Sequence, residues 1–153
     1  NVSMENCTAK GFRLPAGDEW EYAARYRGGD NANAVDGYKT PFFTRGDSAS
    51  GASGNYEDKK ATSSAAVFDD GSIILPIAAA KVKSKKGNVL GLYDMSGNVY
   101  EWCFDWYGGK TENRVLRGGG FGNGAVFTRV GSVQNMSPFS AFGDYGFRIS
   151  RTR

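Results

Sequence analysis

The chain has 153 residues, of which 40% are hydrophobic, 14% aromatic and 23% charged, and its formal net charge is +3. This length suits a single domain with one core, and the composition favours a globular fold over disorder. The basic residues are spread along the chain, so the modest charge gives no reason to expect a nucleic-acid partner. No apolar run approaches the roughly 18 residues that a membrane span requires.

Histidine is absent from the sequence, which removes the commonest general base and the commonest zinc ligand. Two cysteines, Cys7 and Cys103, are too few for a metal cluster, and the sequence leaves open whether they pair. Carboxylates or a free thiol remain as catalytic alternatives, but no spacing singles out a pair of Asp or Glu. We therefore predict that the protein is not an enzyme.

The first elements lie near the N-terminus. Gly11 to Pro15 is expected to be extended, and Ala16 to Arg27 to be a helix, because proline suits a helix start and two carboxylates follow in the first turn. The residues that share the apolar face of this helix are Trp20, Ala23, Ala24 and Arg27. We expect Trp20 to anchor the core.

Residues 28–66 lack periodicity and are predicted to form long irregular loops, with an extended piece at residues 40–44. Five residues around this region could offer oxygen ligands to Ca²⁺, but their spacing matches no known loop and a solvated acidic patch is favoured. They are Asn55, Glu57, Asp58, Asp69 and Asp70. A short strand is expected at residues 72–75, and the lysines of residues 81–86 are expected to form a solvated edge.

Residues 91–107 form the most informative local motif. A turn at residues 96–98 leads into an alternating run whose aromatic face, residues 100, 102, 104 and 106, should be buried. Asp94 and Glu101 bracket the turn. Two carboxylates beside free backbone carbonyls suit Ca²⁺, and an Asx-type turn with the glutamate bound to backbone amides is an equal alternative.

The segment from Gly118 to Phe147 obeys no period and carries two charges, Arg129 and Asp144, where the chain average of 23% predicts about seven. A surface rich in aromatic and small polar residues but poor in Lys and Glu is typical of a binding surface. A glycine-rich core segment with inward-facing rings is the alternative. Residues 114–117 and 146–151 flank the segment and alternate as half-buried strands do.

Several blocks of the chain resemble the signature blocks of the formylglycine-generating enzyme (sulfatase-modifying factor) family, in the family order. They are Gly11 to Pro15 with Glu19 to Arg25, Gly91 to Trp102, Arg114 to Gly119, and Gly146 to Arg148. The resemblance implies an α+β, C-type-lectin-like domain with little regular secondary structure over residues 1–153, expected to be the C-terminal part of a longer chain. It also implies a structural Ca²⁺ held by the side chains of Asp94 and Glu101 and the carbonyls of Gly97 and Val99.

Enzymes of this family use a pair of reactive cysteines in the segment between the last two blocks, and here that segment contains none. The segment is instead similar to the variable region of proteins diversified by retroelements. Residues kept at matching spacing are Gly118, Gly119, Ala125, Arg129, Val130, Pro138, Gly146, Phe147 and Arg148. Asparagines of that region would stand at Gly122, Gly124, Val126, Phe127, Ser132, Ser140, Phe142, Gly143 and Asp144.

Randomising the adenines of asparagine codons cannot produce Lys, Glu, Gln, Met or Trp, which fits the missing Lys, Glu and Trp but not Gln134 and Met136. The resemblance implies a displayed surface, at the cell surface or outside the cell, that binds a protein or cell-surface ligand. The predicted contact residues are Phe121, Gly122, Asn123, Gly124, Val126, Phe127, Ser132, Phe139, Ser140, Phe142, Asp144 and Tyr145. The alternatives are a formylglycine-generating-type oxidase, its inactive paralogue and, more weakly, a carbohydrate-binding lectin.

Overall fold

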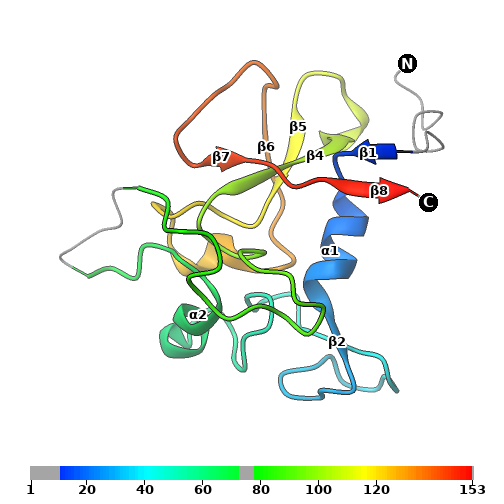
Figure 1. Ribbon diagram of the computed structural model, residues 1–153, viewed down its shortest axis with the longest axis vertical. Helices are drawn as coiled ribbons and strands as arrows, with labels where there is room; N and C mark the ends of the chain where they lie inside the picture. The colour runs from blue at the N-terminus through cyan, green and yellow to red at the C-terminus, as the bar shows by residue number, and fades with distance from the viewer. Residues whose placement is uncertain (1–10, 73–77, 153) are drawn as a thin grey trace.

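The computed structural model of the chain describes residues 11–72 and 78–152 (Figure 1). Regular elements are short, and long connections join them. In chain order they are β1 (Gly11–Arg13), α1 (Gly17–Arg25), β2 (Tyr26–Gly28), β3 (Phe42–Phe43), α2 (Lys59–Ala65), β4 (Tyr100–Trp106), the 3₁₀ turn η2 (Tyr107–Gly109), β5 (Arg114–Arg117), the 3₁₀ turn η3 (Ala125–Thr128), β6 (Gln134–Met136), β7 (Tyr145–Gly146) and β8 (Ser150–Thr152). The α+β class with little regular structure is confirmed.

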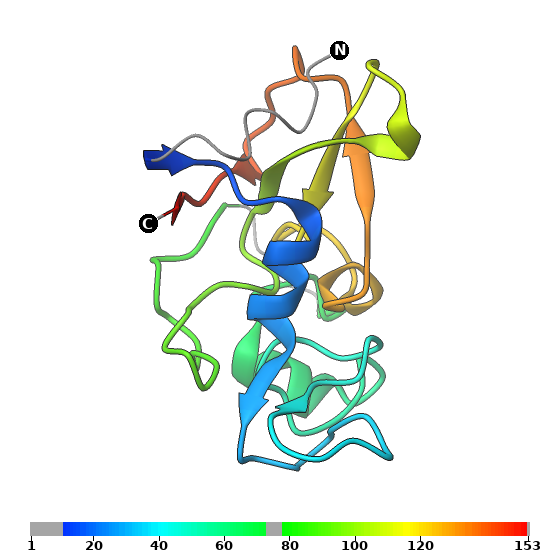
Figure 2. The ribbon, with the colours of Figure 1, turned by 90° about the vertical axis from the view of Figure 1, so that its right-hand side faces the viewer.

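Three small sheets organise these strands. The largest has the order β6-β5-β4-β7, in which β4 pairs antiparallel with β5 and parallel with β7. β1 pairs with β8, and β2 pairs with β3. Figures 1 and 2 show the four-stranded sheet at one end of the molecule, α2 and the loops of residues 28–66 at the other, and α1 running between them.

The predicted first helix is confirmed as α1, although it ends at Arg25 because the next three residues pair with β3. The Glu19 carboxylate accepts the backbone N–H of Ala16 at 2.9 Å and so satisfies one donor of the first turn. Trp20 and Ala24 are fully buried in the core, in the same cluster as residues of β4 and β5. Trp20 is therefore the core anchor that its position predicts.

The prediction of irregular structure throughout residues 28–66 is wrong in part, because α2 lies within that range. Asp58 caps this helix by accepting the N–H of Ala61 at 2.9 Å. The helix buries small side chains, and with Phe68 they form a second core cluster. Its members are Ala49, Ala52, Ala65, Ala66 and Phe68. Helix α2 thus contributes to a core of small residues rather than to an apolar stripe of large ones.

Other predicted elements fare differently. The extended piece at residues 40–44 contains β3, so that prediction is confirmed. The strand at residues 72–75 falls largely outside the described residues. Residues 81–88 form a mixture of turn, bend and irregular backbone, so the expected edge of a sheet is wrong, while most of their lysines are exposed as expected. Within the described residues no helix is both long and apolar enough to cross a membrane.

The prediction that the aromatic face of the alternating run is the buried one is wrong in part. Tyr100 is buried, but Trp102, Phe104 and Trp106 are half-buried, whereas Glu101 and Cys103 on the other face of β4 are both buried. The reason is the position of α1, which packs on the Glu101 face. The Trp20 indole N–H donates to Glu101 at 2.6 Å, and the Gly17 N–H donates to Asp105.

Candidate functional site

A hollow of about 360 Å³ lies over the four-stranded sheet. Tyr100 of β4 and Leu116 of β5 contribute to its wall from the framework. The remaining lining residues all belong to the segment 118–147: Asn123, Gln134, Asn135, Met136, Phe142, Asp144 and Tyr145. The segment that the sequence sets apart by its composition therefore supplies most of one concave surface.

Tyr145 is the centre of an aromatic cluster at this hollow. Its ring lies 5.0 Å from that of Phe142 and 5.7 Å from those of Tyr100 and Trp102, measured between centroids. Each pair meets edge to face, the arrangement that aromatic quadrupoles favour. Through Tyr145, the cluster connects the Phe142 ring, which is 58% exposed, to the buried ring of Tyr100.

The electrostatics of the hollow are set by burial and by Asp144. Burial, and then the charge of Asp144, raise the pKa of the Tyr100 phenol to about 12. The same two causes raise the pKa of Tyr145. Both hydroxyls are therefore neutral near pH 7 and can donate or accept hydrogen bonds. Asp144 brings a carboxylate group to the wall of the hollow.

The backbone of the segment is tied to the framework by hydrogen bonds that do not depend on side-chain identity. Bonds of this kind, all between 2.7 and 2.9 Å long, join Gly97 to Gly118, Asn98 to Phe121, Asp69 to Asn123, Ser48 to Val130, Gly46 to Gly131 and Tyr100 to Asp144. The buried Arg117 guanidinium also donates to the carbonyl of Ser132 at 2.8 Å. The segment thus has a fixed path even where its side chains reach solvent.

The structure separates the predicted contact residues into groups. Asn123, Phe142, Asp144 and Tyr145 line the hollow, while Phe139, which is 96% exposed, lies in the loop between β6 and β7. Gly122 is also exposed. The others, at least partly accessible, are Phe121, Gly124, Val126, Phe127 and Ser140.

The prediction of Ser132 as a contact residue is wrong, because the residue is buried, with 8% of its surface exposed. Sequence reasoning also missed Tyr100, Leu116 and the strand β6, residues 134–136, as parts of the hollow. Gln134 and Met136 of this strand lie outside the expected asparagine positions. β6 pairs with β5 over three residues. No local sequence pattern indicates this pairing, so only a prediction of the sheet topology would have found it.

Glycines in the segment differ in the space around them. A side chain added at Gly122, Gly124 or Gly143 would meet no atom within 4 Å. A Cβ at Gly119, where φ is +81°, would lie 2.8 Å from the carbonyl oxygen of Phe127. The three open glycines stand where asparagines are expected, whereas Gly119 belongs to the Gly-Gly block.

The predicted calcium ligands lie at the turn before β4, but their side chains contact other groups. The Glu101 carboxylate receives the Arg148 guanidinium at 2.5 and 2.6 Å as well as the Trp20 indole. Asp94 accepts the backbone N–H of Lys83 at 2.8 Å. A carboxylate already neutralised by a guanidinium is a poor ligand for a cation, so Glu101 as arranged does not favour Ca²⁺. The calcium site, with the carbonyls of Gly97 and Val99, stays a prediction.

The thiol of Cys103 has the character of a core side chain. It is fully buried, and burial raises its pKa to about 12. A thiolate is the reactive form of cysteine, so this thiol is unsuited to nucleophilic attack or to metal binding at neutral pH. Cys7 lies outside the described residues. Among the residues that are described, no group of three His, Cys, Asp or Glu side chains is arranged to hold a metal ion.

Curated relatives of the chain differ in what they do. It is 30% identical to the chaperone protein LppX of Paenibacillus barcinonensis, over 95% of this chain and 51% of that protein. Identity is 29% to the formylglycine-generating enzyme of Streptomyces coelicolor, over 98% of this chain and 51% of the enzyme. It is 30% to the inactive C-alpha-formylglycine-generating enzyme 2 of Bos taurus, over 98% of this chain and 47% of that protein. The chain therefore spans about half the length of these relatives.

Among solved structures, Treponema denticola variable protein 1 is similar with a TM-score of 0.66 and 33% sequence identity, over 93% of this chain and 48% of that chain. This likeness agrees with the resemblance to variable proteins in the sequence. The family described as the sulfatase-modifying factor enzyme 1-like domain matches residues 3–153. That match covers almost the whole chain, which therefore belongs to the sulfatase-modifying factor enzyme 1-like domain family.

Proposed function

We propose that this domain is a non-catalytic ligand-binding protein that presents residues 118–147 as a diversified surface. The hollow over the sheet and the exposed rings of Phe139 and Phe142 would form the contact area for a protein or cell-surface ligand. Display at the cell surface or outside the cell belongs to the same proposal, and it rests on the likeness to variable proteins.

The observation that carries the proposal is the space around the glycines. All three glycines at expected asparagine positions, Gly122, Gly124 and Gly143, can accept a Cβ with no other atom within 4 Å. In the constant blocks, a Cβ would lie 2.8 Å from the Phe127 carbonyl oxygen at Gly119 and 3.0 Å from a Val99 methyl group at Gly146, so both positions are crowded. A segment that is rewritten by mutation needs this division between open and crowded positions.

Backbone anchoring supports the proposal for the same reason. Because main-chain hydrogen bonds fix both ends and the middle of the segment, a change of side chain leaves its path intact. Anchors buried in the framework, such as Thr128 and Val130, occupy positions outside the expected asparagine set. Binding would then be altered by mutation with little loss of stability.

The absence of cysteine from residues 118–147 and the burial of Cys103 support the non-catalytic part. The Streptomyces coelicolor relative is an enzyme, so oxidation of a cysteine is the alternative to test. Incubation with copper and a cysteine-containing sulfatase-motif peptide should give no aldehyde by mass spectrometry. Aldehyde formation that depends on the protein would overturn the non-catalytic assignment, and Cys7→Ala and Cys103→Ala variants would show which thiol carries the reaction.

The decisive experiment is to sequence the DNA that encodes Arg114 to Arg148 together with the flank of the gene. We expect a near-copy of this DNA that differs where the copy carries adenine, with substitutions at the codons for Gly122, Gly124, Phe142 and Gly143. If the flank carries no copy, the segment is fixed and the diversified surface is ruled out.

A further inference from the structure

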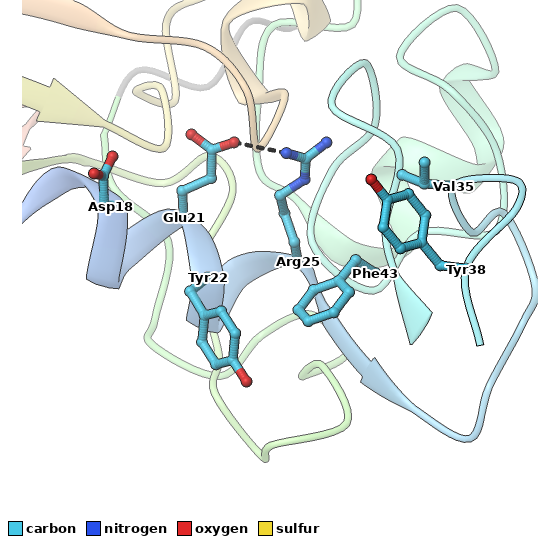
Figure 3. A pocket seen from close by; sticks show the side chains of 7 residues that line it. All are labelled: Asp18, Glu21, Tyr22, Arg25, Val35, Tyr38 and Phe43. Atoms are coloured by element: carbon cyan, nitrogen blue, oxygen red, sulfur yellow. Dashed lines mark hydrogen bonds and ion pairs between the residues drawn. The ribbon is translucent and has the colours of Figure 1, made fainter. Parts of the chain in front are cut away.

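A second cavity, of about 500 Å³, lies on the outer side of α1, and it shares no lining residue with the hollow over the sheet. One wall is a row of α1 side chains spaced by three or four residues, and the other is formed by residues 35–43 (Figure 3). The lining residues are Asp18, Glu21, Tyr22, Arg25, Val35, Tyr38 and Phe43. Its volume is in the range of small-molecule sites.

The apolar part of this cavity is aromatic and packed in place. The Tyr22 ring lies 5.4 Å from that of Phe43, and both lie 6.0 Å from the ring of Tyr26. The Tyr38 ring is 67% exposed and faces the cavity from the opposite wall. These surfaces suit a ring-sized apolar body, which would stack on Tyr22 and Phe43.

The charges of the cavity favour an anion at one end. The Glu21 carboxylate is held by two guanidinium groups: it accepts from Arg25 Nη1 at 2.8 Å and from Arg117 Nη2. This cluster of three groups therefore has a net charge of +1. The other carboxylate, Asp18, lies seven residues before Arg25, about 10 Å away along the helix axis.

At this end of the cavity, Arg25 has a hydrogen-bond donor that is available to a ligand. Its Nε donates to the carbonyl of Thr44 at 3.0 Å and its Nη1 to Glu21, while Nη2 has no hydrogen-bond partner among the described residues. Figure 3 shows the guanidinium of Arg25 and the hydroxyl of Tyr38 directed to the same side of the pocket. Two donors beside an excess positive charge form a site for a carboxylate.

We propose that this cavity binds a small organic monocarboxylate with a ring-sized apolar body. The body packs against Tyr22, Tyr38 and Phe43, and the carboxylate accepts hydrogen bonds from Arg25 Nη2 and the Tyr38 hydroxyl. Asp18 disfavours a second negative charge at the other end. This site is separate from the diversified surface and uses residues outside the segment 118–147.

The test uses three probes with the same phenylpropyl body: 3-phenylpropionate, 3-phenylpropanamide and 3-phenylpropylamine. Titrations followed by backbone amide NMR give both the affinity and the location of binding. We expect the carboxylate to bind about tenfold more tightly than the amide, as a charge-assisted hydrogen bond implies, and the amine to bind most weakly. Shifts should appear at Tyr22, Val35 and Phe43 and not at Tyr145.

Arg25→Gln should reduce the preference for the carboxylate over the amide to less than about twofold. Arg45→Gln is the matched control, since Arg45 is an exposed arginine that pairs with Asp36 and does not line the cavity. Tyr38→Phe keeps the ring and removes one donor, so it should weaken the carboxylate more than the amide, because the bond to the carboxylate is charge-assisted. It also serves as the test if Arg25→Gln fails to fold.

Three outcomes would overturn the proposal. These are tighter binding of the amine than of the carboxylate, absence of binding by all three probes at millimolar concentration, and shifts confined to the hollow at Tyr145. The diversified surface would be unaffected by any of them, because the DNA comparison tests it independently.

Discussion

The core around α1 and β4 is held together by specific side chains, whereas residues 118–147 are joined to that core by many backbone hydrogen bonds and by the buried side chains of Thr128 and Val130. In the first region Trp20 and Arg148 both donate hydrogen bonds to Glu101, and each is replaceable only at a cost. In the second, the hydrogen bonds join main-chain atoms that every residue except proline has in full. The difference shows how a domain can keep one shape while part of its surface changes.

The largest expected effect is in the framework. Trp20→Ala removes a ring that is 1% exposed and leaves Glu101 without its indole donor, so the free energy of unfolding should fall by about 3–5 kcal/mol. Phe139→Ala, in the segment, should change it by less than about 0.5 kcal/mol. Urea denaturation of both variants measures the contrast, and equal losses would break it.

The ion pair between Arg148 and Glu101 is the next test. Arg148→Met leaves a buried carboxylate unpaired and should cost about 3 kcal/mol in chemical denaturation. Arg151→Met is the matched control, because Arg151 is exposed on β8 and its guanidinium lies over the exposed ring of Phe12, 5.6 Å from the ring centroid. A similar loss of stability in both variants would mean that the ion pair with Glu101 stabilises the fold no more than an exposed arginine does.

The same pair allows the calcium prediction to be tested. If calcium binds at the turn before β4, Ca²⁺ at 100 times its Kd stabilises the domain by about 2.7 kcal/mol, and Asp94→Ala removes that gain. If Arg148 and Trp20 satisfy Glu101 and no calcium binds, the melting temperature is the same in Ca²⁺ and in chelator. Thermal unfolding in both conditions distinguishes the two arrangements.

Glycine substitutions sharpen the comparison within the segment itself. Gly119→Ala forces a side chain toward the Phe127 carbonyl at a left-handed φ, and should cost about 2 kcal/mol. Gly122→Ala meets open space and should be neutral or slightly stabilising, since alanine restricts the unfolded chain. If chemical denaturation finds both changes equally harmful, the division into open and crowded positions is wrong.

Alkaline pH tests the base of the hollow. The pKa of Tyr100 is raised to about 12 from 10, so the folded protein retains this proton longer than the unfolded chain does. Its contribution to stability, about 2 kcal/mol, is therefore complete below pH 10 and lost as the pH rises toward 12. Tyr100→Phe should flatten this loss in urea midpoints measured between pH 9 and 12. A slope that is unchanged in the variant would exclude Tyr100 as the cause.

The smallest effect is expected at the rim. Phe142→Ala loses an edge-to-face contact with Tyr145 and should cost about 1 kcal/mol, because the ring is more than half exposed. Binding to any ligand of the hollow should fall much more than stability does. A loss near that of Trp20→Ala in thermal unfolding would instead make Phe142 a core residue.

Sequence patterns predicted α1 because its apolar residues recur at helical spacing after a proline. They did not predict α2, since its buried residues are Ala and Thr and have little contrast with their Ser and Lys neighbours. Alternation along β4 separated its two faces correctly but could not say which one is inside. The burial of the Glu101 face depends on contacts with Trp20 and Arg148, which lie 81 and 47 residues away from Glu101 in the sequence.

The candidate site was predictable to a similar degree. The low charge of residues 118–147 indicated a surface segment, and the exposed rings of Phe139 and Phe142 agree with it. The hollow was not predictable, because β6 becomes part of its wall only through pairing with β5. Ser132 was misplaced for a related reason, since its backbone is held by the buried Arg117, a contact that no local pattern reveals.

The pairing of β1 with β8 also has a consequence for the order of folding. Arg13 and Thr152 are 139 residues apart and share a hydrogen bond, so closing this small sheet brings together two distant parts of the chain. During synthesis β1 has to wait for its partner until residues 150–152 leave the ribosome. The segment 118–147 is made before that closure, and a long-range step of this kind is expected to be slow. In newly made domains, residues 118–147 would therefore be present before the sheet that joins β1 to β8 is complete.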